Sequence, residues 1–101
     1  MDEKKLQEMQ TIEQRLQNVL FQKQSFQIEL SETDAALSEI EKAGDEVFKV
    51  IGQLMIKSEK SKIKEELLNK KKLLELRLGS FEKQEASLSE QLERLRDEII
   101  N

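Results

Sequence analysis

The sequence predicts a mostly α-helical protein: a long antiparallel two-helix coiled coil with one β-hairpin at the crossover. Three observations predict this fold. Apolar residues recur in alternating steps of three and four along two long segments. Between these segments lies a short run, residues 45–58, that is rich in β-branched residues and contains a glycine. Charged residues make up 38% of the 101-residue chain and aromatic residues only 4%, which is typical of long helices rather than of a thick globular core. We expect one domain spanning residues 1–101.

The first helix is predicted over residues 4–43. No proline or glycine interrupts this segment, and at about 1.5 Å per residue the helix would be roughly 55 Å long. Gly44 follows the last periodic residue, so we expect it to end the helix in a left-handed C-cap. The predicted seam has eight apolar sites out of ten and consists of Met9, Ile12, Leu16, Val19, Lys23, Phe26, Leu30, Thr33, Leu37 and Ile40.

A β-hairpin is predicted over residues 46–57. Its strands would cover residues 46–50 and 53–57, with Ile51 and Gly52 in a turn for which Gly52 supplies the positive φ. A two-stranded hairpin is at best marginally stable alone, and its open edges favour pairing with other chains. The alternative is a capping loop packed on the helix ends. We expect an oligomerisation surface formed by Val47, Phe48, Val50, Ile51, Gly52, Leu54, Met55 and Ile56.

The second helix is predicted over residues 59–100. Ser58 is a candidate N-cap, with Glu59 placed to favour the positive end of the helix dipole. Gly79 lies inside this helix and costs up to about 1 kcal/mol relative to alanine, which marks close packing or a bend. The second seam also has eight apolar sites out of ten: Leu67, Lys71, Leu74, Leu78, Phe81, Glu85, Leu88, Leu92, Leu95 and Ile99.

Charge determines how the two helices are expected to pair. Residues 29–46 carry seven acidic side chains against one lysine, and residues 57–72 carry seven lysines against three glutamates. An antiparallel hairpin places these blocks side by side, where they attract each other. In this register Lys71 lies opposite Thr33 and Lys23 lies near Glu85. The two seam lysines either extend along the helix flank to water, the interpretation that we favour, or form buried pairs.

The composition excludes several classes of function. The chain has no cysteine and no histidine, so it lacks thiolate metal ligands, disulfides and the commonest general base. We therefore expect no enzymatic activity and no cofactor. A net charge of −4 argues against nucleic-acid binding, and the lysine block at residues 57–72 lacks interleaved aromatic residues. No apolar run approaches the roughly 20 residues of a membrane span, and the N-terminus lacks a signal-peptide pattern, so we expect a cytoplasmic protein with no membrane partner.

Three stretches resemble the β-class subunit of the archaeal prefoldins. They are RLQNVLFQKQSFQIEL in the first predicted helix, EVFKVIGQLMIKS at the crossover and LLELRLGSFEKQEASLSEQL in the second helix. The hairpin run from Val50 to Lys57 and the run from Leu74 to Glu85 are the most specific parts of this likeness. The α class has a second hairpin between its helices, whereas only one insert is visible in this sequence.

This resemblance implies an assembly and a function. The family forms a hexamer of two α and four β subunits, in which the hairpins build an oligomeric β-barrel. It captures non-native polypeptides without ATP at the coiled-coil tips and passes these clients to a group II chaperonin. On this chain the implied client contacts are Leu6, Met9, Ile12, Leu92, Leu95, Ile99 and Ile100.

Coiled-coil physics is consistent with binding at the tips. The end of a coiled coil has no further layer to cover its apolar sites, and a cluster that includes methionine repacks easily against varied partners. The alternative is that these residues are only the frayed last turns of the two helices. The alternative function is a structural coiled-coil spacer or dimerisation module. Such a protein needs neither apolar helix ends nor an apolar hairpin that pairs with other chains.

Overall fold

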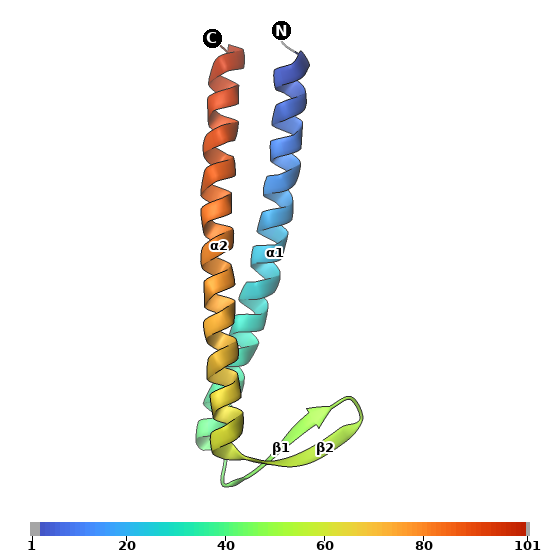
Figure 1. The fold of residues 1–101 in the computed structure, drawn as a ribbon, viewed down its shortest axis with the longest axis vertical. Helices are drawn as coiled ribbons and strands as arrows, with labels where there is room; N and C mark the ends of the chain where they lie inside the picture. The colour runs from blue at the N-terminus through green and yellow to red at the C-terminus, as the bar shows by residue number, and fades with distance from the viewer. Residues whose placement is uncertain (1–2, 101) are drawn as a thin grey trace. The chain divides into compact units, whose positions relative to one another are not determined.

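The computed structural model describes residues 3–100 and contains four elements (Figure 1). They are α1 (Glu3–Lys42), β1 (Glu46–Ile51), β2 (Leu54–Glu59) and α2 (Lys60–Ile100). The chain divides into two compact units. The terminal unit contains the residues up to Phe26 and from Arg77 onward, and the hairpin unit contains Gln27–Leu76. In each unit α1 and α2 run antiparallel, so the predicted fold class of two paired helices with one hairpin is confirmed.

The two helices pack along the predicted seam. Every seam position named from the sequence is buried or half-buried, including the polar ones. Among the described residues no large side chain is completely buried, because a two-helix core leaves each seam residue a solvent-facing edge. The apolar side chains that are buried most completely are Val19, Ile40, Val47, Leu74, Leu78, Phe81 and Leu92.

In the terminal unit a polar layer of the seam lies next to an aromatic one. Lys23 Nζ donates a hydrogen bond to Glu85 Oε2 at 2.9 Å, and both side chains are partly buried. The rings of Phe26 and Phe81 lie 5.3 Å apart, and the guanidinium of Arg77 lies 5.7 Å from the centre of the Phe26 ring. The hydrogen bond from Lys23 to Glu85 raises the pKa of Lys23. Lys23 therefore pairs with Glu85 across the seam while both side chains keep some contact with water, an arrangement between the two predicted alternatives.

In the hairpin unit the two charge blocks meet as predicted. Lys70 pairs with Glu29 at 3.4 Å and Lys71 pairs with Asp34 at 2.8 Å. Lys64 also forms an ion pair with Glu41. The hydrogen bond from Lys64 lowers the pKa of Glu41, and the hydrogen bond to Asp34 raises the pKa of Lys71. The side chain of Lys71 stays more than a third exposed, as expected for a seam lysine whose ammonium reaches the helix flank.

The ends of the helices differ from the sequence prediction. Among the described residues, only Gly52 has a positive φ, so the left-handed cap predicted at Gly44 is wrong. The Ala43 N–H instead donates to the carbonyl oxygens of Glu39 and Ile40 in the last turn, and Lys60 Nζ donates a hydrogen bond to the carbonyl oxygen of Ala43 itself at 2.8 Å.

The start of α2 also needs correction. Ser58 lies in β2, where it pairs with Val47 in the ladder, and α2 begins only at Lys60, so the predicted N-cap at Ser58 is wrong. Within α2, a Cβ built on Gly79 would meet no atom within 4 Å. Close packing therefore does not explain this glycine.

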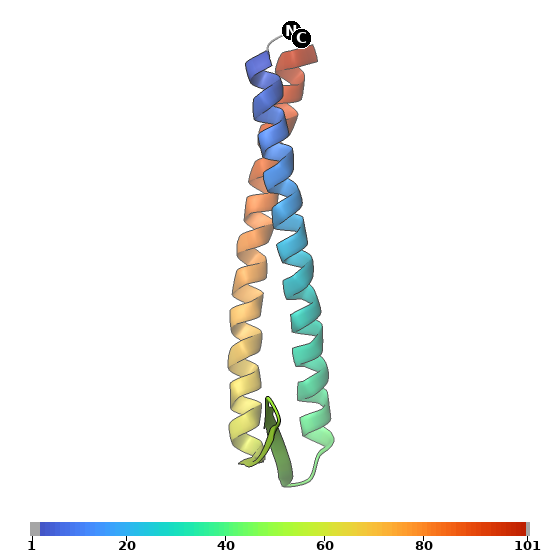
Figure 2. The same cartoon turned by 90° about the vertical axis from the view of Figure 1, so that its right-hand side faces the viewer.

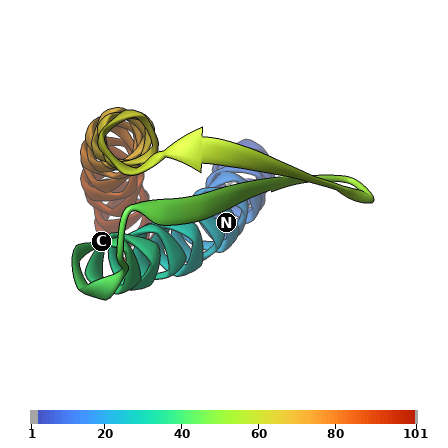
Figure 3. The same ribbon diagram turned by 90° about the horizontal axis from the view of Figure 1, so that it is seen from below.

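The hairpin has a two-residue loop, Gly52–Gln53, because Ile51 pairs with Leu54. Gly52 has a φ of 59°, as predicted, and Gln53 does not share the positive φ. Positive φ at the first central residue alone is the pattern of a type II′ turn, which requires glycine at that position. The predicted turn placed Gly52 second, so the loop lies one residue further along the chain than predicted and each cross-strand partner is shifted by two residues, with Val50 paired to Met55 rather than to Gln53. Figure 3 shows the two strands leaving the helix ends of this unit as a projecting ribbon.

The seam predicts that two adjacent leucines of α2 contribute very differently to the free energy of unfolding. Leu74 is 5% exposed and Leu73 is 64% exposed. We expect Leu74→Ala to lower the free energy of unfolding by about 2 kcal/mol or more, because it removes seam contacts and leaves a cavity. Leu73→Ala, the matched control, should change it by less than about 0.5 kcal/mol. Chemical denaturation of the full chain measures both, and equal effects would contradict the seam assignment.

The ion pair of Glu41 predicts a dependence of stability on pH. A carboxylate whose folded-state pKa is lowered stabilises the fold above its unfolded pKa, about 4.3, and loses this contribution as the pH falls through the folded value. Glu41→Gln should therefore lower the melting temperature at pH 7 relative to Glu39→Gln. Glu39 lies in the same helical turn, and no ion pair is described for it within residues 3–100.

Thermal unfolding of these two variants at several pH values tests this prediction. The difference in melting temperature should shrink as the pH falls below the unfolded pKa of about 4.3, and it should vanish only below the lowered folded-state pKa, where Glu41 is protonated in both states. A difference that persists unchanged at pH 3 would show that the ion pair is not its cause.

Candidate functional site

The hairpin carries six exposed apolar side chains, here called the hairpin patch. The ladder register places residues 48, 50 and 55 on one face of the hairpin and residues 51, 54 and 56 on the other. Both faces are therefore apolar, which is unusual for the surface of a soluble monomer. The patch consists of Phe48, Val50, Ile51, Leu54, Met55 and Ile56, whose exposed fractions run from 45% to 69%.

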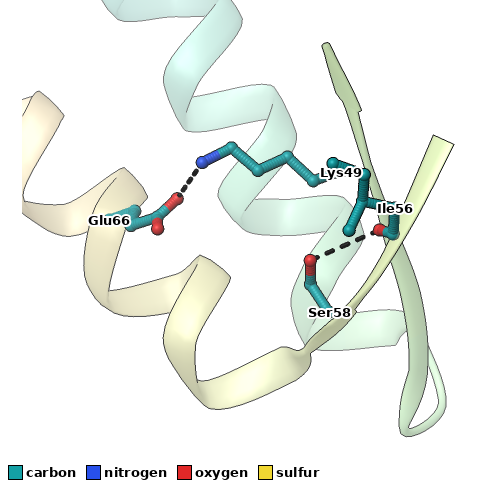
Figure 4. Close-up of polar contacts among 4 residues, drawn as sticks. All are labelled: Lys49, Ile56, Ser58 and Glu66. Atoms are coloured by element: carbon teal, nitrogen blue, oxygen red, sulfur yellow. Dashed lines mark hydrogen bonds and ion pairs between the residues drawn. The ribbon is translucent and has the colours of Figure 1, made fainter. Parts of the chain in front are cut away.

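The base of the hairpin is anchored to its own unit. Val47 is buried, and Lys49 Nζ lies 3.0 Å from Glu66 Oε2 of α2 (Figure 4). Ser58 donates a hydrogen bond to the carbonyl of Ile56 at 3.3 Å. The capping-loop alternative requires the apolar side chains to pack on the helix ends. Of the apolar residues predicted for oligomerisation, only Val47 does so, and Gly52 lies exposed in the turn.

A groove lies between the hairpin base and the adjoining helix ends. Its volume is about 690 Å³, and its lining includes Ile40, Val47, Ile63 and Leu67. In the described part of the chain, β1 and β2 pair only with each other, so each strand keeps one open edge. Open backbone edges, an apolar patch and an adjacent groove together form a surface suited to strands from other chains.

The helix ends near Glu3 and Ile100 lie side by side in the terminal unit (Figures 1 and 2). Lys5 and Glu98 pair across them at 3.4 Å. Of the residues implied as client contacts, Leu6 is 37% exposed and Ile100 is 81% exposed. Leu92 is buried in the seam, and the other four, Met9, Ile12, Leu95 and Ile99, are half-buried.

The closed helix ends therefore present only part of the predicted contact set. Ile12 and Leu95 line a shallow groove of about 230 Å³ together with charged Glu8, Arg94 and Glu98. The half-buried residues become fully accessible only if the two helices separate locally. Helix ends open readily because their last turns have few contacts.

Other site chemistry is limited in this structure. Within residues 3–100 no group of three or more acidic, cysteine or histidine side chains is arranged to hold a metal ion. Neither described helix has an apolar stretch long enough to cross a membrane. The features described above support non-covalent binding of apolar segments.

Two contacts that position the hairpin were missed by sequence analysis. They are the ion pair between Lys49 and Glu66 and the hydrogen bond from Lys60 to Ala43. A signal for the first was available, because strand alternation places Lys49 on the same face as Val47. The second could not be found from sequence patterns, since it joins a side chain to a backbone carbonyl 17 residues away.

Comparison with known proteins identifies the family. The family model described as "Prefoldin subunit" matches residues 3–101. Prefoldin subunit beta of Thermococcus onnurineus is 43% identical over 94 residues, covering 91% of this chain and 81% of the relative. Prefoldin subunit beta of Pyrobaculum arsenaticum is 42% identical over 87 residues, covering 84% of this chain and 70% of the relative.

A solved structure agrees with these relatives. The crystal structure of the prefoldin beta subunit from Thermococcus strain KS-1 matches with a TM-score of 0.88 and 41% sequence identity, covering 94% of this chain and 85% of that one. The sequence likeness and the shared arrangement of two helices around one hairpin lead to the same conclusion. This chain belongs to the prefoldin family, and within the family it matches the archaeal β-class subunits.

Proposed function

We propose that this chain is the β-class subunit of an ATP-independent cytoplasmic chaperone. Its hairpin joins those of α-class and other β-class subunits in a hexamer of two α and four β subunits with a shared β-barrel. The coil ends capture non-native polypeptides and pass them to a group II chaperonin. The observation that carries this proposal is the hairpin patch, which is exposed although Val47, the other apolar residue of the two strands, is buried.

Assembly through the hairpin follows from its energetics. An isolated two-stranded hairpin is marginal in water, and burying apolar surface stabilises by about 25 cal/mol per Å². The six patch residues and two open strand edges gain this stabilisation only in contact with other chains. The anchor from Lys49 to Glu66 limits the orientations of the hairpin base, which reduces the entropy lost on assembly.

Client capture at the coil ends follows from the partial exposure of their apolar residues. Leu6 and Ile100 are accessible while the helices are paired, whereas Met9, about one turn after Leu6, and Ile99, directly before Ile100, are half-buried. A client that binds this region exchanges contacts between the two helices for contacts with its own apolar side chains. Such exchange suits varied sequences, because it depends on apolar area rather than on a fixed set of hydrogen bonds.

A structural spacer is the competing function, and molecular mass separates it from the chaperone subunit. A spacer forms an elongated dimer by itself. A prefoldin-like β subunit forms a defined hexamer only when an α-class subunit is added. Light scattering of the chain alone and after mixing with an α-class subunit distinguishes the two functions.

The first prediction concerns the hairpin patch. Replacing both Phe48 and Val50 by aspartate should abolish hexamer formation with an α-class subunit, because two carboxylates would be buried without partners in the barrel. The matched control replaces Leu73 and Leu76, which are similarly exposed on α2, by aspartate. Native mass spectrometry reads out both. A hexamer that forms normally with the hairpin variant would contradict its role in assembly.

The second prediction concerns the coil ends. Replacing Leu6, Met9, Leu95 and Ile99 by serine should abolish the delay in aggregation that the hexamer gives a denatured protein, because the apolar contacts are lost. The mass of the hexamer should be unchanged. Serine at Leu73 and Leu76 provides the control and should leave protection intact. Full protection by the four-residue variant would show that clients bind elsewhere.

A further inference from the structure

The middle of α1 in the terminal unit has an exposed face almost without charge. Residues 16–28 contain one charged side chain, Lys23, whereas the average of 38% for the chain would give about five. Lys23 is already paired with Glu85 in the seam. The exposed side chains of this stretch in the terminal unit are therefore amides, a hydroxyl and two large apolar groups. We define the amide face as Gln17, Asn18, Leu20, Phe21, Gln24 and Ser25, all of which are exposed.

Phe21 is the centre of this face. It is 72% exposed and lies outside the seam, whereas Phe26 and Phe81 pack against each other inside it. Residues three and four positions away along a helix are its surface neighbours. For Phe21 these are Gln17, Asn18, Gln24 and Ser25, and none of them is charged.

A second exposed apolar residue shows that this environment is unusual for the chain. Leu68 is 43% exposed, the same as Leu20 of the amide face. Its surface neighbours, three and four positions away, are all charged: Lys64, Glu65, Lys71 and Lys72. An apolar residue between charges is ordinary on a solvated helix surface, because a partner covering it would have to desolvate those charges. Around Phe21 this cost is absent.

We propose that the amide face binds extended, uncharged and apolar stretches of non-native polypeptide, as a client-contact surface additional to the coil ends. Side-chain amides both donate and accept hydrogen bonds, so they match the free N–H and C=O groups of an extended backbone. Phe21 and Leu20 supply apolar contact, and the lack of charge favours a neutral segment. The proposal rests on the chaperone function proposed above.

A groove next to the amide face is also lined mainly by amide, hydroxyl and apolar side chains. It has a volume of about 400 Å³ and includes Asn18 of the amide face. Val19 and Leu88 are its apolar lining residues, and Gln22, Gln84 and Ser87 add further amide and hydroxyl groups. Arg15 is the single charged residue of the lining. A polypeptide lying over Phe21 can therefore continue into a groove that offers hydrogen bonds to its backbone without requiring charged partners.

A peptide-binding measurement tests this surface. The probe is a synthetic peptide of roughly 12 residues of leucine, phenylalanine, serine and asparagine, long enough to extend across several helical turns and carrying a neutral fluorophore. Its binding to the hexamer is followed by fluorescence anisotropy. Phe21→Ala should weaken binding about fivefold or more, and Leu68→Ala, the control among charged neighbours, should leave it unchanged. A second peptide, with aspartate and lysine in place of the serines, should bind more weakly to the wild-type hexamer.

A crosslinking measurement locates the client directly. A photoreactive benzoyl-phenylalanine at position 21 should crosslink to a reduced and alkylated, permanently unfolded protein, and the same group at position 68 should not. Both positions are exposed, so neither substitution is expected to disturb the fold, and circular dichroism verifies this. Equal crosslinking from the two positions would overturn the proposal.

The remaining outcomes separate this inference from the proposed function. If Phe21→Ala binds the peptide normally and the four-residue coil-end variant does not, the amide face is not a client-contact surface. The proposed capture of clients at the coil ends is then still supported. If Phe21→Ala reduces self-association, measured by sedimentation, but leaves peptide binding unchanged, the amide face binds a second copy of this chain. That result also overturns the proposal. Failure of the wild-type hexamer to protect any denatured protein overturns the chaperone function itself.

Discussion

The packed seam between α1 and α2 is the interaction on which the rest of the molecule depends. Because only two helices meet, each seam side chain has one edge toward water, and stability comes from many partly buried layers rather than from a central core. The polar layer of Lys23 and Glu85 fits this arrangement, since both groups keep some contact with solvent while they pair. Next to it, the paired rings of Phe26 and Phe81 fill a wide layer.

Charged side chains favour the antiparallel pairing of the two helices and fix the base of the hairpin. Exposed ion pairs contribute little stability individually, but opposing blocks on α1 and α2 disfavour the arrangements that would bring like charges together. The same acidic and basic segments flank the hairpin. Lys60 caps the end of α1 and Lys49 reaches Glu66, so the base of the hairpin is fixed while its tip remains free.

The apolar residues that are exposed or partly exposed have different environments. Those of the hairpin occupy both faces of a sheet with open edges, which suits pairing with other strands. Those of the seam at the helix ends partly cover each other, and a local separation of the two helices would expose them further. Phe21 lies among uncharged side chains, whereas Leu68 lies among charges, and this difference in the cost of desolvation distinguishes a binding surface from an ordinary exposed residue.

The sequence by itself determined the helices, both seams, the antiparallel pairing and the positive φ of Gly52, because each depends on a repeated pattern or on a local backbone requirement. The tertiary structure decided the ends of the helices, the turn register, the pairing of Lys23 with Glu85 and which coil-end residues are exposed. The turn register depends on how the two whole strands pair, and the other features depend on contacts between residues far apart in the chain. A periodic pattern predicts which face of a helix is buried, but the partner of an individual side chain is set only when the two helices are packed together.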